Sequence, residues 1–397
     1  MSTHFRPIDP PTRILLGPGP SDVAPSVARA LAMPTVGHLD PEFLRIMDQV
    51  REMLRTAFRT RNELTLPMSG TGSAGMETCF VNLIEPGDEV LVGVHGVFGG
   101  RMAEVAERCG ARVTRVEGEW GRAIDPQRFA DAAKGRRFKA LAVVHAETST
   151  GVLQPIPPLR EVANECGALL IVDCVTSHAG CDLRLDDWGI DAAYSGTQKC
   201  LSCPPGLSPV SLSERARDVL KKRKSKVPSW YLDLGLIASY WGGERAYHHT
   251  APINMIYGLH EALRLALEEG LEARFERHAR NGRAFAAGLR AMGLAIPVPD
   301  AERLPQLTPV TIPHGVEDGA VRGYLLREFG IEIGGGLGPM KGKAWRIGLM
   351  GAGSTRRNVL LCLGALRVAL TARGHHVQAH PLQAANDALS EPSGTAG

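Results

Sequence analysis

The stretch Tyr194-Ser-Gly-Thr-Gln-Lys-Cys200 decides the fold, because it places Lys199 directly after the short apolar segment Ala192-Ala-Tyr194, where the chain turns. Upstream, the continuous apolar run Ala168-Leu-Leu-Ile-Val-Asp173 is typical of a buried strand that ends in a carboxylate. Parallel strands end at the same edge of a sheet, where ligands bind. The two stretches therefore predict that Asp173 and Lys199 meet at the carboxyl edge of a parallel sheet.

A lysine and an acid in this arrangement suit pyridoxal phosphate. The lysine holds the cofactor aldehyde as a Schiff base, and the acid keeps the pyridine nitrogen protonated, so that the ring withdraws electrons. Taken alone, a lysine after a strand is more often a solvated surface group, and a strand-end aspartate is often a helix cap. Together they favour Lys199 as the nucleophile and Asp173 as its catalytic partner.

Composition and charge bound the class of protein. The 397 residues are 44% hydrophobic and 22% charged, which is ordinary for a globular protein with room for two domains. The net charge of +3 comes from 45 basic and 42 acidic residues, so it favours neither nucleic acid nor a membrane surface as a partner. The first residues lack an apolar signal segment, and no apolar run reaches the roughly 18 residues of a membrane helix. We therefore expect a cytoplasmic protein.

The eight cysteines lie mostly within apolar segments, which favours reduced, buried thiols. Cys200 and Cys203 have the C-x-x-C spacing of redox and zinc sites. Because a single C-x-x-C is weak evidence, we expect no metal.

Apolar strand-like and amphipathic helical segments alternate through the first half of the chain, which predicts an α/β fold whose large domain has a mostly parallel seven-stranded sheet flanked by helices. An amphipathic helix over 41–59 precedes the alternation. The expected strands are Leu64–Met68, Glu89–Val94, Arg112–Val116, Ala140–His145, Leu169–Val172, Ala192–Tyr194 and Pro209–Leu212. The expected helices between them are Ser73–Ile84, Gly99–Cys109, Pro126–Lys134 and Pro158–Cys166.

The pattern changes after Arg215, where two long helices, Pro252–Glu269 and Leu271–Met292, are followed by segments typical of a small α+β domain. We expect an extended N-terminal segment over 1–22, a large domain over 23–275, a smaller C-terminal domain over 276–373 and a disordered tail over 374–397.

The turn Gly70-Thr-Gly-Ser-Ala-Gly75 satisfies the dinucleotide fingerprint G-x-G-x-x-G. A dinucleotide site also needs an acid at the end of the next strand, but Glu89–Val94 is followed by His95-Gly96. A single phosphate needs only the glycine turn, free backbone N–H groups and hydroxyls, which Thr71, Gly72 and Ser73 supply. The turn therefore favours a phosphate site over a dinucleotide site or a plain tight turn.

Two further residues follow strands of the same sheet. Phe98 offers an aromatic face that suits stacking on a pyridine ring, although a core aromatic fits the sequence equally well. Thr148 offers a hydroxyl to the ring edge, although loop threonines also cap helices.

These residues make the chain similar to the class V aminotransferases, fold-type I pyridoxal-phosphate enzymes, and specifically to the alanine/serine–glyoxylate aminotransferase branch. The resemblance runs from about Leu15 to Leu370. Its motifs are Leu16-Gly-Pro-Gly-Pro-Ser21, Gly37-His38, Ser69-Gly-Thr-Gly72, Glu147-Thr-Ser-Thr-Gly-Val-Leu-Gln-Pro155, Val172-Asp173, Tyr194-Ser-Gly-Thr-Gln-Lys199, Pro204-Pro-Gly206, Tyr231-Leu-Asp233, Tyr247-His-His-Thr250 and Arg346-Ile-Gly348.

The resemblance implies a role for each matching residue. Lys199 would carry the cofactor, Asp173 would pair with its ring nitrogen, Phe98 would stack on the ring and Thr148 would lie near the ring hydroxyl and the substrate. The substrate carboxylate would bind Arg346, near Gly19. The phosphate would be held by Thr71, Gly72, Ser73 and Gln198, joined by Tyr247 and Thr250 from the partner subunit of a homodimer with shared active sites.

The function that follows is transfer of an amino group from alanine or serine to glyoxylate, giving glycine and pyruvate or hydroxypyruvate by a ping-pong mechanism. An alternative is (S)-ureidoglycine–glyoxylate transamination, for which Asn254 offers an amide, although a helix-start cap is the commoner role. A lyase or desulfurase use of the cofactor is a further alternative, but no clear mobile-loop cysteine lies between Arg322 and Gly348. A non-catalytic dinucleotide-binding module would leave Lys199 without a role.

Overall fold

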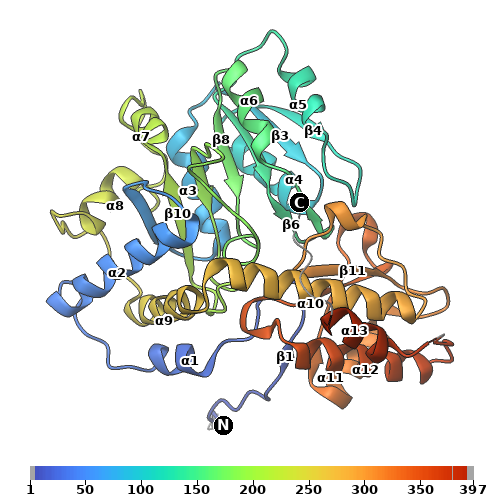
Figure 1. The fold of residues 1–397 in the computed structure, drawn as a ribbon. Helices are drawn as coiled ribbons and strands as arrows, with labels where there is room; N and C mark the ends of the chain where they lie inside the picture. The colour runs from blue at the N-terminus through green and yellow to red at the C-terminus, as the bar shows by residue number, and fades with distance from the viewer. Residues whose placement is uncertain (1–4, 378, 391–397) are drawn as a thin grey trace.

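A seven-stranded sheet forms the centre of the first half of the chain in the computed structural model, which describes residues 5–377 and 379–390 (Figure 1). Its strand order is β2-β10-β9-β8-β5-β3-β4. Only β10 runs antiparallel to its neighbours β2 and β9, so six strands are parallel to one another. The predicted mostly parallel, seven-stranded α/β sheet is therefore confirmed. Its strands are β2 (Leu64–Ser69), β3 (Glu89–Val94), β4 (Arg112–Glu117), β5 (Ala140–Val144), β8 (Leu169–Asp173), β9 (Ala192–Tyr194) and β10 (Leu207–Leu212).

Helices cover both faces of this sheet because its central strands are apolar and buried along their whole length. The helix α2 begins after Asp40, whose side chain accepts from the backbone N–H of Glu42, and it buries Phe43, Met47, Val50 and Leu54 at helical spacing. The helices of this half are α1 (Pro25–Leu31), α2 (Pro41–Phe58), α3 (Gly72–Leu83), α4 (Val97–Arg108), α5 (Pro126–Ala133), α6 (Pro157–Glu165), α7 (Glu214–Lys221) and α8 (Leu234–Trp241). A short hairpin, β6 (Ala146–Glu147) with β7 (Val152–Leu153), follows β5.

The second half of the chain begins with α9 (Ile253–Glu269), which packs on α1 and α2, and continues into α10 (Leu271–Ala291). A small three-stranded antiparallel sheet, in the order β11-β14-β13, lies beside α10 (Figure 1). The N-terminal strand β1 (Ile14–Leu15) pairs in parallel with β12 (Ile331–Glu332), so the start of the chain joins its last third. The remaining elements are β11 (Leu307–Thr311), α11 (Asp318–Phe329), β13 (Gly334–Gly335), β14 (Ala344–Gly348), α12 (Arg356–Thr371) and α13 (Pro381–Ser390).

Separate hydrophobic clusters lie in the two parts of the chain. Two of them sandwich the large sheet, one on each side, and include Phe80 on α3 and Phe129 on α5. Another includes Trp345, which is fully buried on β14 between α10 and α12. Leu16, directly after β1, belongs to this last cluster, which places the turn at Gly17–Asp22 between the two parts.

The predicted disordered tail over 374–397 is wrong for its central part. Residues Pro381–Ser390 form α13, which packs against α10 and α12 and buries Pro381 and Ala385 (Figure 1). The helix is short and alanine-rich, so its own periodicity is weak, and packing on a neighbouring helix stabilises it. Residues 391–397 lie outside the described residues.

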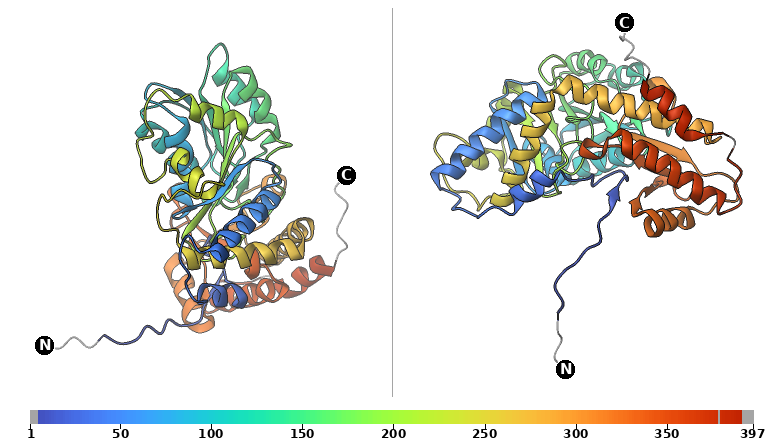
Figure 2. Two further views of the ribbon diagram at one scale, coloured as in Figure 1. Left: turned by 90° about the vertical axis from the view of Figure 1, so that its left-hand side faces the viewer. Right: turned by 60° about the horizontal axis from the view of Figure 1, so that its bottom comes forward.

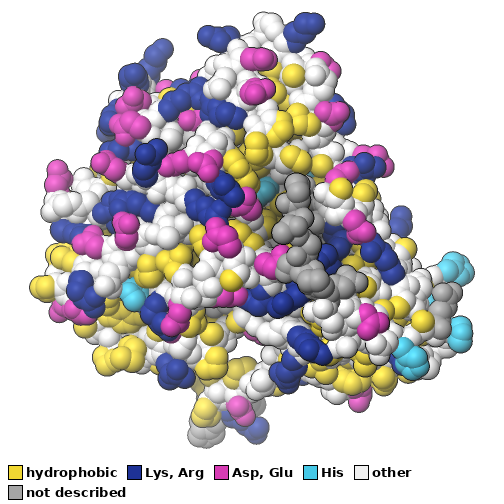
Figure 3. All heavy atoms as spheres, in the orientation of Figure 1, with side chains coloured by type: hydrophobic (Ala, Val, Ile, Leu, Met, Phe, Trp, Pro, Cys, Tyr) yellow, Lys and Arg dark blue, Asp and Glu magenta, His cyan; other side chains and the backbone are white. Residues whose placement is uncertain are grey.

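The surface carries both signs of charge. On the face that Figure 3 shows, Lys and Arg side chains alternate with Asp and Glu side chains, as the nearly balanced composition predicts. Residues 5–13, which precede β1, extend away from the rest of the chain (Figure 2). Within residues 5–377 and 379–390, none of the helices combines the length and apolarity needed to cross a membrane.

Candidate active site

A cavity of about 200 Å³ lies at the carboxyl ends of the parallel strands. It collects residues that follow β2, β3, β5, β8 and β9, as expected for a parallel sheet. Eight predicted site residues line it: Thr71, Gly72, Ser73, Phe98, Thr148, Asp173, Gln198 and Lys199. The predicted residues that do not line it within this chain are Gly19, Tyr247, Thr250 and Arg346.

Asp173 is the last residue of β8 and is 3% exposed. Its Oδ1 accepts a hydrogen bond from the backbone N–H of Val175, with an N···O distance of 2.8 Å. Burial raises the pKa of the Asp173 carboxyl to about 7, although the Val175 bond opposes the shift. The carboxylate is therefore costly to ionise until a positive partner lies beside it, which a protonated ring nitrogen supplies.

Lys199 lies in the turn after β9, and the Gly-Pro loop at the start of the chain closes over it. Its Nζ donates a hydrogen bond to the carbonyl of Pro18, and the Ser21 hydroxyl donates to the Lys199 carbonyl at 2.7 Å. A Cβ on Gly19 would lie 2.4 Å from the lysine Nζ, so a larger residue there would displace the amine. Burial, followed by repulsion from Arg346, lowers the pKa of Lys199 to about 8. A substantial fraction of the amine is therefore neutral, and nucleophilic, near pH 8.

The amino terminus of α3 forms the opposite end of the cavity. Helix α3 begins directly after Thr71, and no side chain in the described part of the protein caps it. The first N–H groups of a helix have no partner within the helix, so those of Gly72 and Ser73 are available to an anion. Gly72 packs against Gly196, with a built Cβ only 3.6 Å from the Gly196 Cα, which brings the lysine turn close to the helix end.

The cavity fits pyridoxal phosphate on the residues present. Gln198 lines the cavity beside the uncapped end of α3, and its side-chain NH2 group is a donor suited to an anion. The phosphate would be held there by Thr71, Gly72, Ser73 and Gln198. Asp173 and Lys199 offer the acid and the amine that the ring nitrogen and the aldehyde need.

Phe98, in the first turn of α4, forms one wall of the cavity, as the stacking prediction requires. The guanidinium of Arg101 lies over the Phe98 ring, with its central carbon 5.1 Å from the ring centroid. Sequence analysis missed Arg101 as a lining residue, although its spacing of three from Phe98 on a helix would have found it. The other lining residues not predicted are Met76, Val144, Ala146, Val175, Thr176 and Tyr194.

Arg346 lies on β14, beside the cavity and behind Thr148. Its Nε donates to the Gly335 carbonyl at 2.8 Å, and its Nη1 donates to the Thr148 carbonyl at 3.2 Å. The residue is 8% exposed and forms no ion pair with any carboxylate of the described residues. Burial lowers the pKa of the guanidinium, and the charge of Glu147 opposes that shift. A buried guanidinium without an ion-pair partner is suited to bind a carboxylate.

The segment that carries Tyr247 and Thr250 lies outside the cavity of its own chain. Tyr247 is 61% exposed, and its hydroxyl lies 3.5 Å from that of Thr250. Asn254, at the start of α9, uses its amide within the chain: Nδ2 donates to the carbonyls of Leu31 and Met33, and Oδ1 accepts from Thr35. Both amide hydrogens are engaged, so this structure does not present Asn254 as a donor to a ureido group.

Cys200 and Cys203 are both buried, and neither forms a disulfide. The Cys200 thiol lies 3.3 Å from the Thr176 carbonyl. Burial raises the pKa of the Cys200 thiol to about 11, which leaves it protonated and weakly reactive near neutral pH. Within residues 5–377 and 379–390, no group of three or more His, Cys, Asp and Glu side chains is arranged to hold a metal ion.

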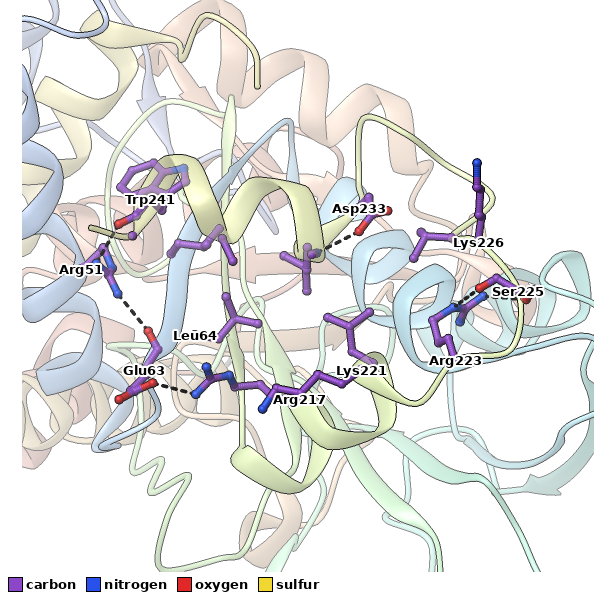
Figure 4. Close-up of a pocket in the computed structure, with 17 residues that line it drawn as sticks. Arg51, Glu63, Leu64, Arg217, Lys221, Arg223, Ser225, Lys226, Asp233 and Trp241 are labelled. Atoms are coloured by element: carbon purple, nitrogen blue, oxygen red, sulfur yellow. Dashed lines mark hydrogen bonds and ion pairs between the residues drawn. The ribbon is translucent and has the colours of Figure 1, made fainter. Parts of the chain in front are cut away.

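A second cavity, of about 530 Å³, lies between β2, α7 and α8 and shares no lining residue with the first (Figure 4). Its basic side chains are largely engaged with their neighbours. Arg217 forms an ion pair with Glu63 at 2.7 Å, and Arg51 donates to the carbonyls of Trp241 and Glu63. None of the predicted site residues lines this cavity.

Comparison with known proteins places the chain beside aminotransferases. The family model for aminotransferase class-V matches residues 26–345. The crystal structure of ureidoglycine–glyoxylate aminotransferase from Bacillus subtilis is 43% identical, with a TM-score of 0.95, and the match covers 97% of this chain and 100% of that one. The crystal structure of alanine–glyoxylate aminotransferase from Nostoc sp. is 48% identical, with a TM-score of 0.91, over 92% of this chain and 97% of that one. Alanine–glyoxylate aminotransferase of Callithrix jacchus is 43% identical over 92% of this chain and 89% of its own length.

Proposed function

The chain belongs to the class V aminotransferase family and is a pyridoxal-phosphate-dependent transaminase with the fold-type I architecture, and we propose that it transfers the amino group of alanine or serine to glyoxylate. The products are glycine and pyruvate or hydroxypyruvate. The observation that carries the proposal is the buried Arg346, whose guanidinium lacks an ion-pair partner among the described residues and lies beside a cavity of about 200 Å³. A cation of this kind suits substrates that carry a carboxylate, as amino acids and keto acids do.

Lys199 acts as the base of the reaction. Pyridoxal phosphate, when bound, supplies the aldehyde that takes up the amino group and a ring that withdraws electrons from the substrate Cα. The Lys199 Nζ removes the proton from that Cα and returns a proton in the reverse half of the cycle. Its lowered pKa of about 8 supports this role, because the base must be neutral to accept the proton.

Asp173 holds the proton at the ring nitrogen. Its raised pKa of about 7 reflects burial, which hydrogen bonds and the charge of Lys199 only partly offset, and a protonated ring nitrogen would supply a further cation. Thr148 and Phe98 line the cavity, and they would lie near the ring hydroxyl and against the ring face of the bound cofactor. Arg346 orients the carboxylate that every amino and keto acid of the cycle carries, and Gly19, beside the Lys199 amine, is the other expected substrate contact.

We propose that the enzyme is a homodimer with shared active sites. Tyr247 is 61% exposed in its own chain and lies in the segment that ends at Thr250, so the pair is free to reach the phosphate site of a partner subunit. The division into a large domain over 23–275 and a small domain over 276–373 is supported by their separate hydrophobic clusters. The eight unpaired cysteines support a reducing, cytoplasmic location.

Ureidoglycine is the second candidate donor. The (S)-ureidoglycine–glyoxylate transaminase of Bacillus subtilis is 42% identical to this chain, and the match covers 95% of each. The intrachain bonds of Asn254 weigh against it. The experiment is a donor panel of alanine, serine and ureidoglycine with glyoxylate as acceptor, measuring glycine formed. We expect kcat/KM to be highest with alanine or serine, and a preference for ureidoglycine would overturn that choice of donor.

A further inference from the structure

Helix α4 is capped by a side chain from a distant part of the sequence. Its own N-cap residue is Gly96, which has no side chain. The backbone N–H groups of Phe98 and Gly99 both donate to the Glu147 Oε2, at 3.1 and 3.2 Å. The preceding N–H, that of Val97, donates to the Ser149 hydroxyl at 2.9 Å. All three first N–H groups of the helix are therefore satisfied from the turn after β6.

Glu147 accepts four hydrogen bonds. Burial raises the pKa of its carboxyl, and these hydrogen bonds oppose the shift. The residue is fully buried, and its Oε1 accepts from the backbone N–H of Ser149 at 3.0 Å and from the Ser149 hydroxyl at 2.5 Å. Its four hydrogen-bond partners are all donors, and no Lys or Arg of the described residues forms an ion pair with it. The positive end of the helix dipole compensates its charge.

The backbone around this carboxylate is shaped to admit it. A Cβ on Gly96 would lie 2.4 Å from the Glu147 Cδ and 2.5 Å from the Ser149 hydroxyl oxygen. Any larger residue at position 96 would therefore expel the carboxylate from the helix end. The missing side chain of Gly96 thus leaves the space that the Glu147 carboxylate occupies.

The same turn contacts two walls of the active site. On one side it fixes the first turn of α4, from which Phe98 lines the cavity. On the other side Thr148, between the two capping residues, lines the cavity and accepts the hydrogen bond from Arg346 through its carbonyl. A shift of Glu147 would therefore move the ring-stacking aromatic relative to the rest of the site.

We propose that Glu147 is a positioning residue, whose carboxylate caps α4 and thereby holds the Phe98 ring in place for the cofactor. The inference rests on the proposed stacking of Phe98 on the pyridine ring. It adds a residue, and a contact between distant parts of the chain, that the assignment of the site does not contain.

The first test measures the hydrogen bonds that cap α4, independently of enzyme activity. Glu147→Gln keeps the shape but leaves one acceptor oxygen for four donors, and its NH2 group replaces either Oε2, which caps Phe98 and Gly99, or Oε1, which binds Ser149. Glu147→Leu, which removes both oxygens, is therefore measured beside it in every assay. Hydrogen exchange, followed by mass spectrometry on the purified holoenzyme, should show the amides of 97–99 exchanging about tenfold faster or more. The matched control is Glu302→Gln, since Glu302 also accepts from a backbone N–H, that of Ala123 at 2.6 Å, without lining the cavity. Its exchange at 97–99 should equal that of the wild type.

The second test measures the consequence for the cofactor. We expect Glu147→Gln to raise the Kd for pyridoxal phosphate on the order of tenfold and to reduce the visible circular dichroism of the bound cofactor. If the effect passes through Phe98, Glu147→Gln should add little to the Kd in a Phe98→Ala background. A general loss of stability would instead raise the Kd equally in both backgrounds.

The outcomes separate the two claims. Unchanged exchange at 97–99 in both Glu147→Gln and Glu147→Leu, or an equal change of Kd in both backgrounds, overturns the role of Glu147. If Phe98→Ala alone leaves the Kd and the circular dichroism unchanged, the stacking assignment is wrong, and the positioning role fails with it even where the exchange data establish the cap. Should Glu147→Gln fail to fold, Ser149→Ala replaces it in the same assays, since it removes the acceptor of Val97 and one donor to Glu147.

Discussion

Lys199 and Pro18 are joined by a hydrogen bond from the lysine Nζ to the proline carbonyl. The bond links the turn after β9 to a loop almost at the start of the chain, so the proposed nucleophile is held by residues far away in sequence. Gly19, which follows Pro18, has a positive φ of 106°, a conformation that favours glycine. A Cβ on its α-carbon would point at the Lys199 amine.

Gly19→Ala should therefore damage the site more than the fold. The new Cβ would meet the Lys199 Nζ, and the positive φ adds roughly 1–3 kcal/mol of strain. We expect transaminase kcat/KM to fall by at least about tenfold while the far-ultraviolet circular dichroism stays unchanged. Gly37→Ala is the control, because no atom of residues 5–377 and 379–390 lies within 4 Å of the Cβ that alanine would add there. Equal activity of the two variants would refute the close approach of Gly19 to the amine.

Asp173→Asn should change how the stability of the cofactor-free protein depends on pH. Burial raises the pKa of Asp173 to about 7 in the folded state, so the folded protein holds this proton more tightly than the unfolded chain. The contribution is fully present below about pH 4 and is lost as the pH rises to about 7. Asparagine does not titrate. The difference in the free energy of unfolding, variant minus wild type, should therefore increase with pH in this window, by up to about 1.4 kcal/mol per pH unit.

Urea unfolding of both cofactor-free proteins at several pH values between 4 and 8 measures this difference. Four buried histidines, whose pKa values burial lowers, contribute a slope of the opposite sign, which cancels when the two proteins are compared. With pyridoxal phosphate added, the same variant should be severely impaired in transamination, because an amide cannot hold the ring proton by charge. A difference in stability that stays flat across the window would show that Asp173 does not titrate there.

Arg346→Lys should weaken the binding of every substrate in the transition state to a similar degree. Lysine keeps the charge but cannot donate to two carbonyls and bind a carboxylate in two parallel hydrogen bonds. We expect kcat/KM to fall for amino acid and glyoxylate alike, by on the order of 1.5–3 kcal/mol in transition-state binding. The Kd for pyridoxal phosphate should be nearly unchanged. Loss of the cofactor, or wild-type efficiency in both half-reactions, would exclude the carboxylate role.

Mixing two inactive variants tests the shared site. In a heterodimer of Lys199→Ala with the Tyr247→Phe/Thr250→Ala double variant, one site carries both defects and the other carries neither, if Tyr247 and Thr250 serve the partner's phosphate. Partial activity should return on subunit exchange. The control is each variant mixed with itself. No recovery after confirmed exchange would place the whole site within one chain.

The sheet and the cofactor end of the site were predictable because they depend on local signals. Apolar strand periods, the glycine turn before α3 and the strand-end residues Asp173 and Lys199 are all visible in short stretches of sequence. Glu147 was not predictable as a cap, because its partners Phe98 and Gly99 come from another strand–helix connection and meet it only in the folded chain. The helix α13 was missed for a related reason: its stability comes from packing on α10 rather than from its own pattern.

The most direct test of the central claim follows the absorption of the bound cofactor through one half-reaction at a time. Wild-type protein loaded with pyridoxal phosphate should lose its long-wavelength band when alanine or serine is added, and should regain it when glyoxylate follows. Lys199→Ala should show neither change at a comparable rate, because the base that moves the proton at the substrate Cα is missing. Conversion by the Lys199→Ala variant at the wild-type rate, or a wild-type band that alanine and serine both leave untouched, would contradict the account.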